Sequence, residues 1–321
     1  MNNVTQPVNT TLNSREAEPS HRIQVIINHP AAAHQPRTLA EMVRNTAGEH
    51  LVQVFDELER MIGLAEAKQV MYEIYALLRI NQEREKHKLK QEKQVYHMVF
   101  TGNPGTGKTT VARIVGKIFK QMGILAKGHL IEVERADLVG EFIGHTAQKT
   151  RDLIKKALGG ILFIDEAYSL ARGGEKDFGR EAIDCLTKAM EDQKNEFICI
   201  LAGYTEEMNE FLSLNPGMPS RFPIHIHFRD YSVDELLQIA ELLAAEKEYV
   251  LSAKAKEKLR RQLYALRSDP FQLHFSNARY VRNQIEQAIR AQAVRLLKTA
   301  EPSREELLLL RSEDFTFAQK G

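Results

Sequence analysis

Residues 99–110 read Val-Phe-Thr-Gly-Asn-Pro-Gly-Thr-Gly-Lys-Thr-Thr, an apolar run that passes through a glycine-rich loop into a helical pattern. The loop matches the phosphate-binding pattern G-x-x-x-x-G-K-[ST]. Its glycines allow a tight turn that aims backbone N–H groups at phosphate oxygens, and the following helix directs its positive end to the same point. We therefore expect a nucleotide to contact Gly102, Asn103, Pro104, Gly105, Thr106, Gly107, Lys108, Thr109 and Thr110.

Within this loop, two side chains have separate expected roles. Lys108 supplies a positive charge to the β- and γ-phosphates, and Thr109 supplies a hydroxyl to Mg²⁺. A glycine-rich turn without a ligand is the alternative. The apolar strand before the loop and the helical pattern after it, over residues 110–122, favour the phosphate-binding interpretation.

A second apolar run, over residues 161–164, ends in two carboxylates. Asp165 is suited to hold the Mg²⁺ shell, and Glu166 is suited to orient and deprotonate the attacking water. A small-molecule kinase would exclude water, so the adjacent glutamate favours a hydrolase. The sequence contains no Asn-Lys-x-Asp guanine signature, which indicates ATP rather than GTP.

The remaining pattern predicts an α/β domain followed by helices. Short apolar runs at 95–101, 130–133, 161–164, 197–202 and 224–228 are mostly separated by helical patterns, which is typical of a parallel sheet covered on both faces. After Tyr231 the apolar runs largely stop, and Ser232 with Glu235 forms a capping box ahead of further helices. We expect a weakly ordered arm at 1–37, a nucleotide-binding domain at 38–230, a helical domain at 231–300 and a tail at 301–321.

Composition narrows the functional class and the compartment. The chain has 321 residues, with 44 basic and 43 acidic side chains, and this balance weakly disfavours a nucleic-acid partner. Its two cysteines, Cys185 and Cys199, lie in apolar-periodic segments, which indicates reduced core thiols. We see no signal peptide and no stretch of about 20 apolar residues, so we expect a cytoplasmic protein without a membrane span.

Several longer motifs carry a family resemblance. They are the runs 129–132, 134–140, 144–150 and 165–170. On these runs the chain resembles AAA+ ATPases, and more narrowly the family of red-type rubisco activases and their sporulation relatives, over residues 51–297. The resemblance implies an AAA+ fold with a small helical lid, ATP and Mg²⁺ as cofactors, and a homo-oligomer, usually a hexameric ring. It further implies a motor that remodels a protein client through a central pore, with a role in sporulation.

The resemblance also implies roles for single residues. Phe142, in Phe142-Ile143-Gly144, falls where such motors carry an aromatic pore loop, and a core residue is the alternative. Arg221 matches an arginine finger that acts on a neighbouring subunit's nucleotide, and a surface arginine capping a loop is the alternative. Arg279 matches sensor 2, at the start of a lid helix, and Ile62 with Gly63 matches the loop that brackets adenine.

Several points stay open at this level. The fourth strand ends without the usual Asn or Thr, so either Tyr204 or Thr205 could position the water. His225 and His227 share one side of a strand, but nearby ligands are missing and we do not expect a metal there. An AAA+ machine acting on nucleic acid, or an ATP-gated scaffold with little turnover, are the alternative functions.

Overall fold

The computed structural model describes residues 43–44, 46–90, 94–142, 144–172, 178–194, 196–215, 217–268, 275–298 and 301–317. The chain divides into two compact units, Met1–Pro36 and Arg37–Gly321. The first unit, and with it the arm expected at 1–37, lies outside the described residues.

A five-stranded parallel sheet forms the centre of the nucleotide-binding domain. Its strands are β1 (Met98–Gly102), β2 (Leu130–Val133), β3 (Ile161–Ile164), β4 (Ile198–Gly203) and β5 (Ile224–Phe228). They are ordered β2-β3-β4-β1-β5, and every neighbouring pair is parallel. The expected parallel five-stranded sheet is therefore confirmed. Because β1 lies between β4 and the edge strand β5, the phosphate loop begins at the carboxyl end of an interior strand.

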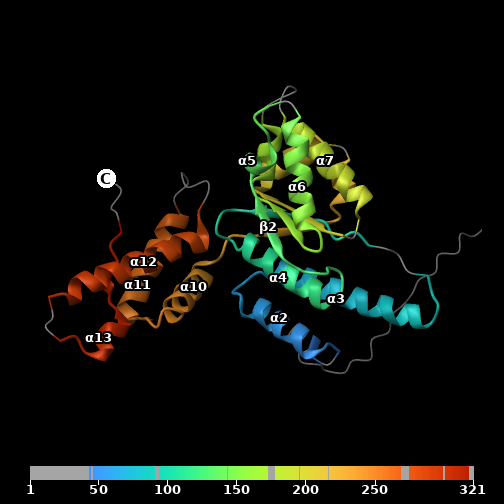
Figure 1. Cartoon of the computed structure of the whole chain (residues 1–321). Helices are drawn as coiled ribbons and strands as arrows, with labels where there is room; N and C mark the ends of the chain where they lie inside the picture. The colour runs from blue at the N-terminus through green and yellow to red at the C-terminus, as the bar shows by residue number, and fades with distance from the viewer. Residues whose placement is uncertain are drawn as a thin grey trace, which may run out of the picture. The chain divides into compact units, whose positions relative to one another are not determined.

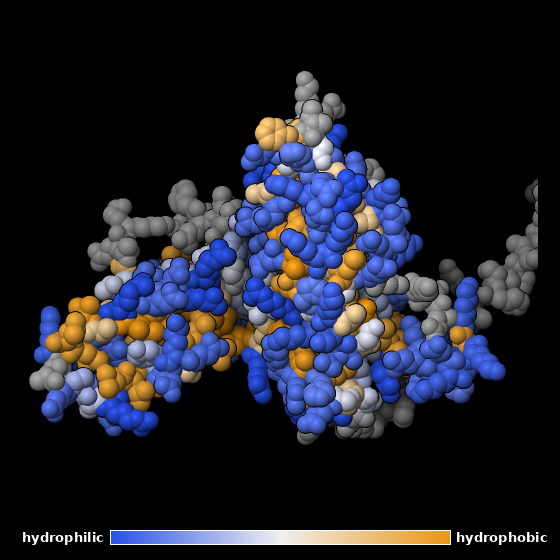
Figure 2. Space-filling view, in the orientation of Figure 1, coloured by the Kyte–Doolittle hydropathy of each residue, from blue (hydrophilic) through white to orange (hydrophobic). Residues whose placement is uncertain are grey.

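Helices cover both faces of this sheet (Figure 1). One face packs on α2 (Glu49–Arg60), α3 (Ala65–Lys86) and α4 (Lys108–Gln121), and the other on α6 (His145–Ala157), α7 (Gly179–Asp192) and α8 (Thr205–Ser213). Successive side chains of a strand point to opposite faces, so Phe100 enters the first core and Val99 the second. Over α6 and α7 the surface is mostly hydrophilic, and hydrophobic atoms show between the helices (Figure 2).

Three short elements complete this domain. They are α5 (Arg135–Leu138), the 3-10 turn η1 (Ala167–Ala171) and α9 (Met218–Arg221). The turn η1 directly follows the acidic end of β3 and packs against α7 and α8. Two of these elements carry residues considered for the site: η1 contains Tyr168, and α9 ends at Arg221.

The second domain is a helical lid, as the sequence predicts. It consists of α10 (Val233–Ala245), α11 (Ala253–Arg267), α12 (Asn277–Leu296) and α13 (Arg304–Leu308), with a 3-10 turn η2 (Ser312–Asp314). It also holds a two-stranded parallel pair, β6 (Val250–Leu251) with β7 (Leu309–Leu310). Strands of two residues leave no alternation to detect, so the sequence pattern does not indicate them.

Residues 301–317, which the sequence analysis sets apart as a tail, pack against the lid. The Gln292 amide donates to the carbonyls of Glu306, Leu307 and Leu309 at 3.0–3.1 Å. Arg295 forms a two-pronged ion pair with buried Asp314, at 2.8 and 2.9 Å.

None of the helices in the described ranges has the length and apolar character that a membrane span requires.

Candidate active site

The phosphate loop between β1 and α4 needs glycine at three positions. Gly102, Gly105 and Gly107 have φ values of 143°, 71° and 101°, which is the region that favours glycine. A Cβ at Gly102 would lie 2.2 Å from the carbonyl oxygen of Phe228, and one at Gly105 would lie 2.3 Å from that of Ser276. The loop is thus shaped both by its own turns and by close contact with β5 and α12.

Lys108, the first residue of α4, lies over this loop. Its Nζ donates to the carbonyl oxygens of Gly102 and Asn103 at 2.7 and 2.9 Å. Burial lowers the pKa of Lys108, and the carboxylate of Asp165 opposes that shift. The ammonium group is therefore held among oxygen acceptors beside an acid, which is where the terminal phosphates of a nucleotide would need a cation.

The two acids follow the fully buried strand β3. The Asp165 backbone N–H donates to Val133, and its Oδ1 accepts from the Glu166 N–H at 3.0 Å. Glu166 has a φ of 46°, a left-handed conformation that costs a residue other than glycine about 1 kcal/mol or more. The sharp turn exposes its carboxylate beside that of Asp165. Backbone strain of this kind is concentrated at functional sites.

Two tyrosines stand next to the acids. The rings of Tyr168 and Tyr204 lie 5.8 Å apart, and the Arg172 guanidinium lies 4.8 Å from the Tyr168 ring centre. Burial, with a contribution from Glu166, raises the pKa of Tyr168 to about 12, and the same two causes raise that of Tyr204. Both phenols stay protonated at neutral pH and can donate a hydrogen bond. Sequence reasoning gave Tyr168 no role, although it lies in the 165–170 motif.

A cavity of about 580 Å³ connects these groups. Ten residues that the sequence analysis assigns to the site line it: Ile62, Pro104, Gly105, Gly107, Lys108, Thr109, Thr110, Asp165, Glu166 and Arg279. Tyr204 lines it as well, whereas Thr205 does not. Gly102, Asn103, Thr106 and Gly63 are not among its lining residues; the first three belong to the loop that shapes it.

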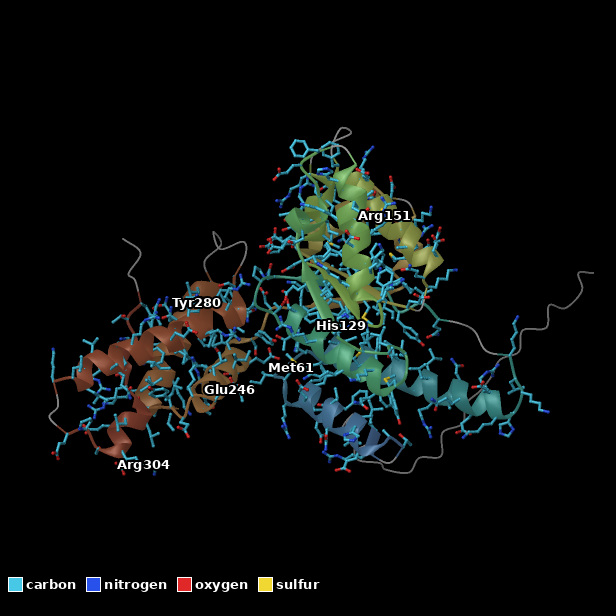
Figure 3. The ribbon with its side chains drawn as sticks, viewed as in Figure 1. Met61, His129, Arg151, Glu246, Tyr280 and Arg304 are labelled. Atoms are coloured by element: carbon cyan, nitrogen blue, oxygen red, sulfur yellow. The ribbon has the colours of Figure 1, made fainter. Side chains whose placement is uncertain are left out.

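One end of the cavity is apolar. Met61 and Ile62 contribute from the end of α2, and Ile239, Leu242 and Leu243 contribute from α10 of the lid. Met61 and Glu246, which Figure 3 labels, both line the cavity, although they come from elements far apart in the sequence. This end has the composition that an adenine ring requires. Apart from Ile62, sequence reasoning missed these residues, because a lid helix shows only its own core-facing pattern.

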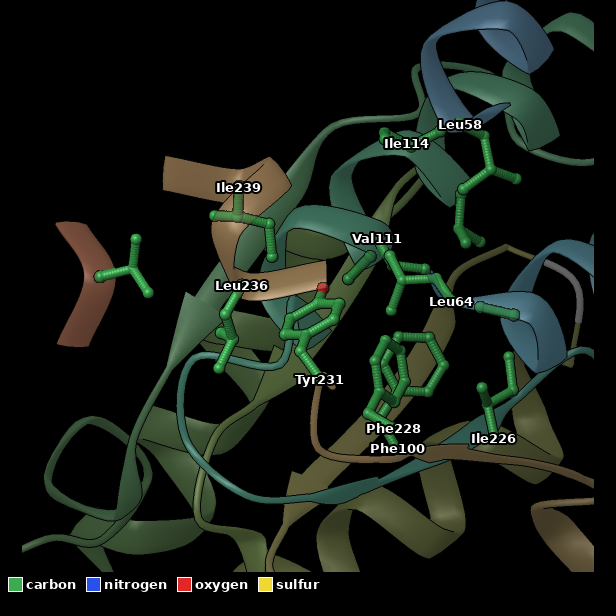
Figure 4. Close-up of a cluster of buried hydrophobic side chains, with 14 of the residues drawn as sticks. Leu58, Leu64, Phe100, Val111, Ile114, Ile226, Phe228, Tyr231, Leu236 and Ile239 are labelled. Atoms are coloured by element: carbon green, nitrogen blue, oxygen red, sulfur yellow. The ribbon is translucent and has the colours of Figure 1, made fainter. Parts of the chain in front are cut away.

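Gly63 lies next to this end, and Tyr231 lines the cavity itself. Gly63 has a φ of 67°, which favours glycine, and a Cβ there would lie 2.8 Å from Oε1 of Glu235, at the flexible end of a side chain of the lid helix. Tyr231 lies between Leu236 and Phe228 (Figure 4), and its hydroxyl donates to the Thr106 carbonyl at 3.0 Å. Burial raises the pKa of Tyr231 to about 12, so the phenol remains a donor.

The residues present fit a magnesium nucleotide. The Thr109 hydroxyl and the Asp165 carboxylate both line the cavity, and Mg²⁺ prefers such oxygen ligands together with phosphate and water. Over the described part of the chain no group of three His, Cys, Asp or Glu side chains could hold a metal by itself. Mg²⁺ does not need such a cage, because it binds by one or two protein oxygens plus the substrate phosphates.

Arg221 is separated from this cavity. It ends α9, its Nη1 donates to the Gly217 carbonyl at 2.6 Å, and its Nη2 pairs with Glu191 of α7. It is not among the cavity's lining residues, whereas Arg279 is. The bond to Gly217 also matches the alternative of an arginine that caps its own loop, so the arginine-finger assignment stays a prediction.

Phe142 has an exposed side chain. It is 64% exposed, and its ring meets His145 edge-on with the ring centres 5.4 Å apart. A core role in this subunit is therefore excluded. Ile143 lies outside the described residues. On β5, a ring nitrogen of His225 bonds the Phe222 carbonyl, and Nδ1 of His227 bonds the Thr101 hydroxyl.

Comparison with known proteins gives consistent matches. Residues 98–230 match the ATPase family associated with various cellular activities (AAA), and residues 232–321 match the AAA lid domain. Stage V sporulation protein K of Bacillus subtilis is 54% identical, covering 93% of this chain and 92% of that protein. Protein CbbX of Cereibacter sphaeroides is 45% identical, covering 78% and 80%. The chloroplastic ribulose bisphosphate carboxylase/oxygenase activase of Cyanidioschyzon merolae is 44% identical, covering 82% and 90%.

Among solved structures, a mutant of RuvB from Thermotoga maritima is similar in fold. It aligns with a TM-score of 0.52 over 80% of this chain and 69% of that one. At 18% identity this likeness concerns the architecture alone.

Proposed function

The chain belongs to the AAA family of ATPases, and we propose that it hydrolyses Mg²⁺-ATP in a hexameric ring to remodel a protein client. The observation that carries the proposal is the meeting of Lys108, Asp165 and Glu166 in one cavity, with an apolar end formed partly by the lid. Such a cavity suits a nucleotide whose terminal phosphate lies beside an exposed carboxylate.

Each residue then has a distinct task. Backbone N–H groups of the loop and Lys108 hold the phosphates, and Thr109 with Asp165 would hold Mg²⁺, which neutralises charge on the phosphate oxygens. Glu166 would accept a proton from the attacking water, because its carboxylate is exposed and lines the same cavity as Asp165, which would hold the metal. Arg279 lines the same cavity, and in this proposal its guanidinium would lie near the transferring phosphoryl group.

The position of Arg221 supports the proposed ring. Its guanidinium lies outside its own cavity, so it can act on ATP only when a neighbouring subunit presents a site to it. An arginine supplied by a neighbour stabilises transition-state charge and accelerates phosphoryl transfer by orders of magnitude. The exposed ring of Phe142 supports a protein client, because an aromatic ring can stack on a polypeptide backbone whatever its sequence.

The test is ATPase activity with added macromolecules. Reduced, carboxymethylated α-lactalbumin serves as an unfolded protein, and single- and double-stranded DNA serve as nucleic acids. Glu166→Gln gives the blank, since it should bind ATP without turnover. Stimulation by the unfolded protein supports remodelling. Stimulation by DNA alone would replace this proposal by a nucleic-acid motor, and negligible turnover under all conditions would leave an ATP-gated scaffold.

We further propose a role in sporulation, on the 54% identity to stage V sporulation protein K. In a spore-forming cell that carries this chain, Glu166→Gln should lower the count of heat-resistant spores and leave vegetative growth unchanged. A normal spore count would reject this role and leave the ATPase assignment intact.

A further inference from the structure

Asn277 is an unusual first residue for the lid helix α12. Its side chain is completely buried, and its φ is 42°. Asparagine adopts the left-handed region more readily than most residues, yet the conformation still has to be stabilised by its surroundings. A buried amide must also find hydrogen-bond partners, because an unsatisfied polar group costs about 1–3 kcal/mol.

The Asn277 amide finds these partners in three different segments. Its Nδ2 donates to Oδ1 of Asp230 at 2.7 Å and to the Phe275 carbonyl at 2.9 Å, and lies 3.4 Å from the Pro104 carbonyl. Its Oδ1 accepts from the Tyr231 backbone N–H at 3.0 Å. One side chain therefore joins the lid, the connection between the domains and the phosphate loop.

Asp230 extends this contact to the other side. Its two carboxylate oxygens accept from Nδ2 of Asn103 at 3.0 and 3.1 Å. Asn103 belongs to the phosphate loop, yet it does not line the nucleotide cavity. Asp230 is thus shared between an amide of the loop and an amide of the lid, behind the surface that would face the nucleotide.

Backbone contacts tighten the same place. The Ala278 N–H donates to the Gly105 carbonyl at 3.2 Å. A Cβ on Gly105 would lie 2.8 Å from the Arg279 nitrogen, so the loop and the start of α12 approach as closely as glycine allows. We call Asn103, Gly105, Asp230 and Asn277 the loop–lid junction.

We propose that Asn277 and Asp230 are positioning residues that couple the shape of the phosphate loop to the position of the lid. If the lid moved away, the Asn277 amide would lose its hydrogen-bond partners and Asp230 would lose the bond from Asn277. Asp230 would then no longer be fixed in position to accept the hydrogen bonds that hold Asn103 in the loop. Lid movement and loop distortion are then one event. Nucleotide bound on the front of the loop stabilises the lid contact behind it, and an intact contact strengthens nucleotide binding by the same factor.

This coupling differs from any direct action of Arg279. Arg279 lines the nucleotide cavity and can touch phosphate, whereas Asn277 is fully buried and does not line it. Loss of Asn277 should therefore weaken triphosphate and diphosphate similarly, because both need the loop. Loss of a group that contacts the terminal phosphate would weaken the triphosphate selectively.

The test compares Asn277→Gly and Asp230→Ala with wild type. Glycine keeps the left-handed backbone and removes only the amide. Asn209→Ala, at an exposed asparagine of α8, is the matched control. Titration with fluorescent ATP and ADP analogues gives the dissociation constants, hydrogen exchange with and without ATP gives protection of α12, and thermal melting confirms folding.

We expect both variants to bind the two analogues about tenfold or more weakly, the effect of losing one or two buried hydrogen bonds. ATP should protect the start of α12 in wild type and in Asn209→Ala, but not in the variants. If Asp230→Ala does not fold, the two single variants Asn277→Gly and Asn103→Ala provide the test.

Wild-type affinity with unchanged α12 protection in the folded variants would overturn the proposal, even if they melt at lower temperature, since a merely structural role predicts that result. Absence of analogue binding by wild type would instead reject the nucleotide site itself, and the coupling with it.

Discussion

At the scale of single residues, His97 shows how burial sets a pKa that the sequence hides. It directly precedes β1, is 1% exposed, and packs against the rings of Phe197 and Phe222. Its Nδ1 accepts the Cys199 backbone N–H at 3.0 Å, which requires the neutral ring. Among the described residues its Nε2 meets no hydrogen-bond partner. Burial lowers the pKa of His97 from 6.5 to about 4.

This depressed pKa predicts acid sensitivity of the fold. The unfolded chain takes up a proton on His97 near pH 6.5 and the folded chain only near pH 4, so stability falls as pH drops through that window. The full loss is on the order of 3 kcal/mol. Urea unfolding of wild type and His97→Gln between pH 7 and pH 4 measures it. The variant should show a flatter dependence, and the exposed-histidine variant His50→Gln should follow wild type; parallel curves for all three would refute the assignment.

Tyr204 carries the second prediction at this scale. Its phenol stays protonated beside Glu166 and Asp165, and it lines the cavity that Thr205 does not reach. Tyr204→Phe keeps the ring contact with Tyr168 and removes only the hydroxyl. We expect kcat to fall about tenfold to a hundredfold with little change in KM, because a hydrogen bond to the water acts in the transition state. Thr205→Val is the matched control, and a larger loss there would assign the water-positioning role to Thr205.

At the scale of elements, the strands were predictable and the contacts between elements were not. The expected runs 130–133, 161–164 and 224–228 coincide with β2, β3 and β5. The interior strand β3 is apolar and buried throughout, as is typical of a strand covered on both faces. The edge strands β2 and β5 include exposed polar residues, such as Glu132 and His225. The phosphate loop and its acids carry specific motifs in the sequence. The loop–lid junction was missed, because Asn103 and Asn277 are far apart in the sequence and only the fold brings both amides to Asp230. The same holds for the lid residues of the apolar end.

Phe142, just before α6, carries the prediction for this scale. The Phe142 ring is 64% exposed, so it is available to pack against a bound polypeptide. Phe142→Ala should leave basal ATPase unchanged and abolish its stimulation by carboxymethylated α-lactalbumin. Leu214→Ala, at an apolar side chain that is 62% exposed at the end of α8, should retain both. Equal loss of basal and stimulated rates in Phe142→Ala would show a structural role, and full stimulation would remove Phe142 from client binding.

At the scale of the whole molecule, the separation of Arg221 from its own cavity predicts that active sites are shared between subunits. Within one subunit the Arg221 guanidinium bonds the Gly217 carbonyl and pairs with Glu191. Lys108, Asp165 and Glu166 line the cavity, and Arg221 does not. If Arg221 completes a neighbour's site, each active site contains residues of two subunits. Turnover per subunit should then rise with protein concentration, because assembly creates the sites.

Mixing two inactive variants tests this directly. Arg221→Ala subunits keep the phosphate-binding lysine, and Lys108→Ala subunits keep the arginine, so random mixing in equal amounts restores about a quarter of the interfaces. We expect ATPase activity to reappear in the mixture, measured against either parent at the same total concentration. The control mixes Lys108→Ala with the double variant Lys108→Ala/Arg221→Ala, where no interface regains both residues. A mixture as inactive as this control, together with turnover independent of concentration, would make the protein a monomeric ATP-gated switch, because hydrolysis would then need nothing from a neighbour.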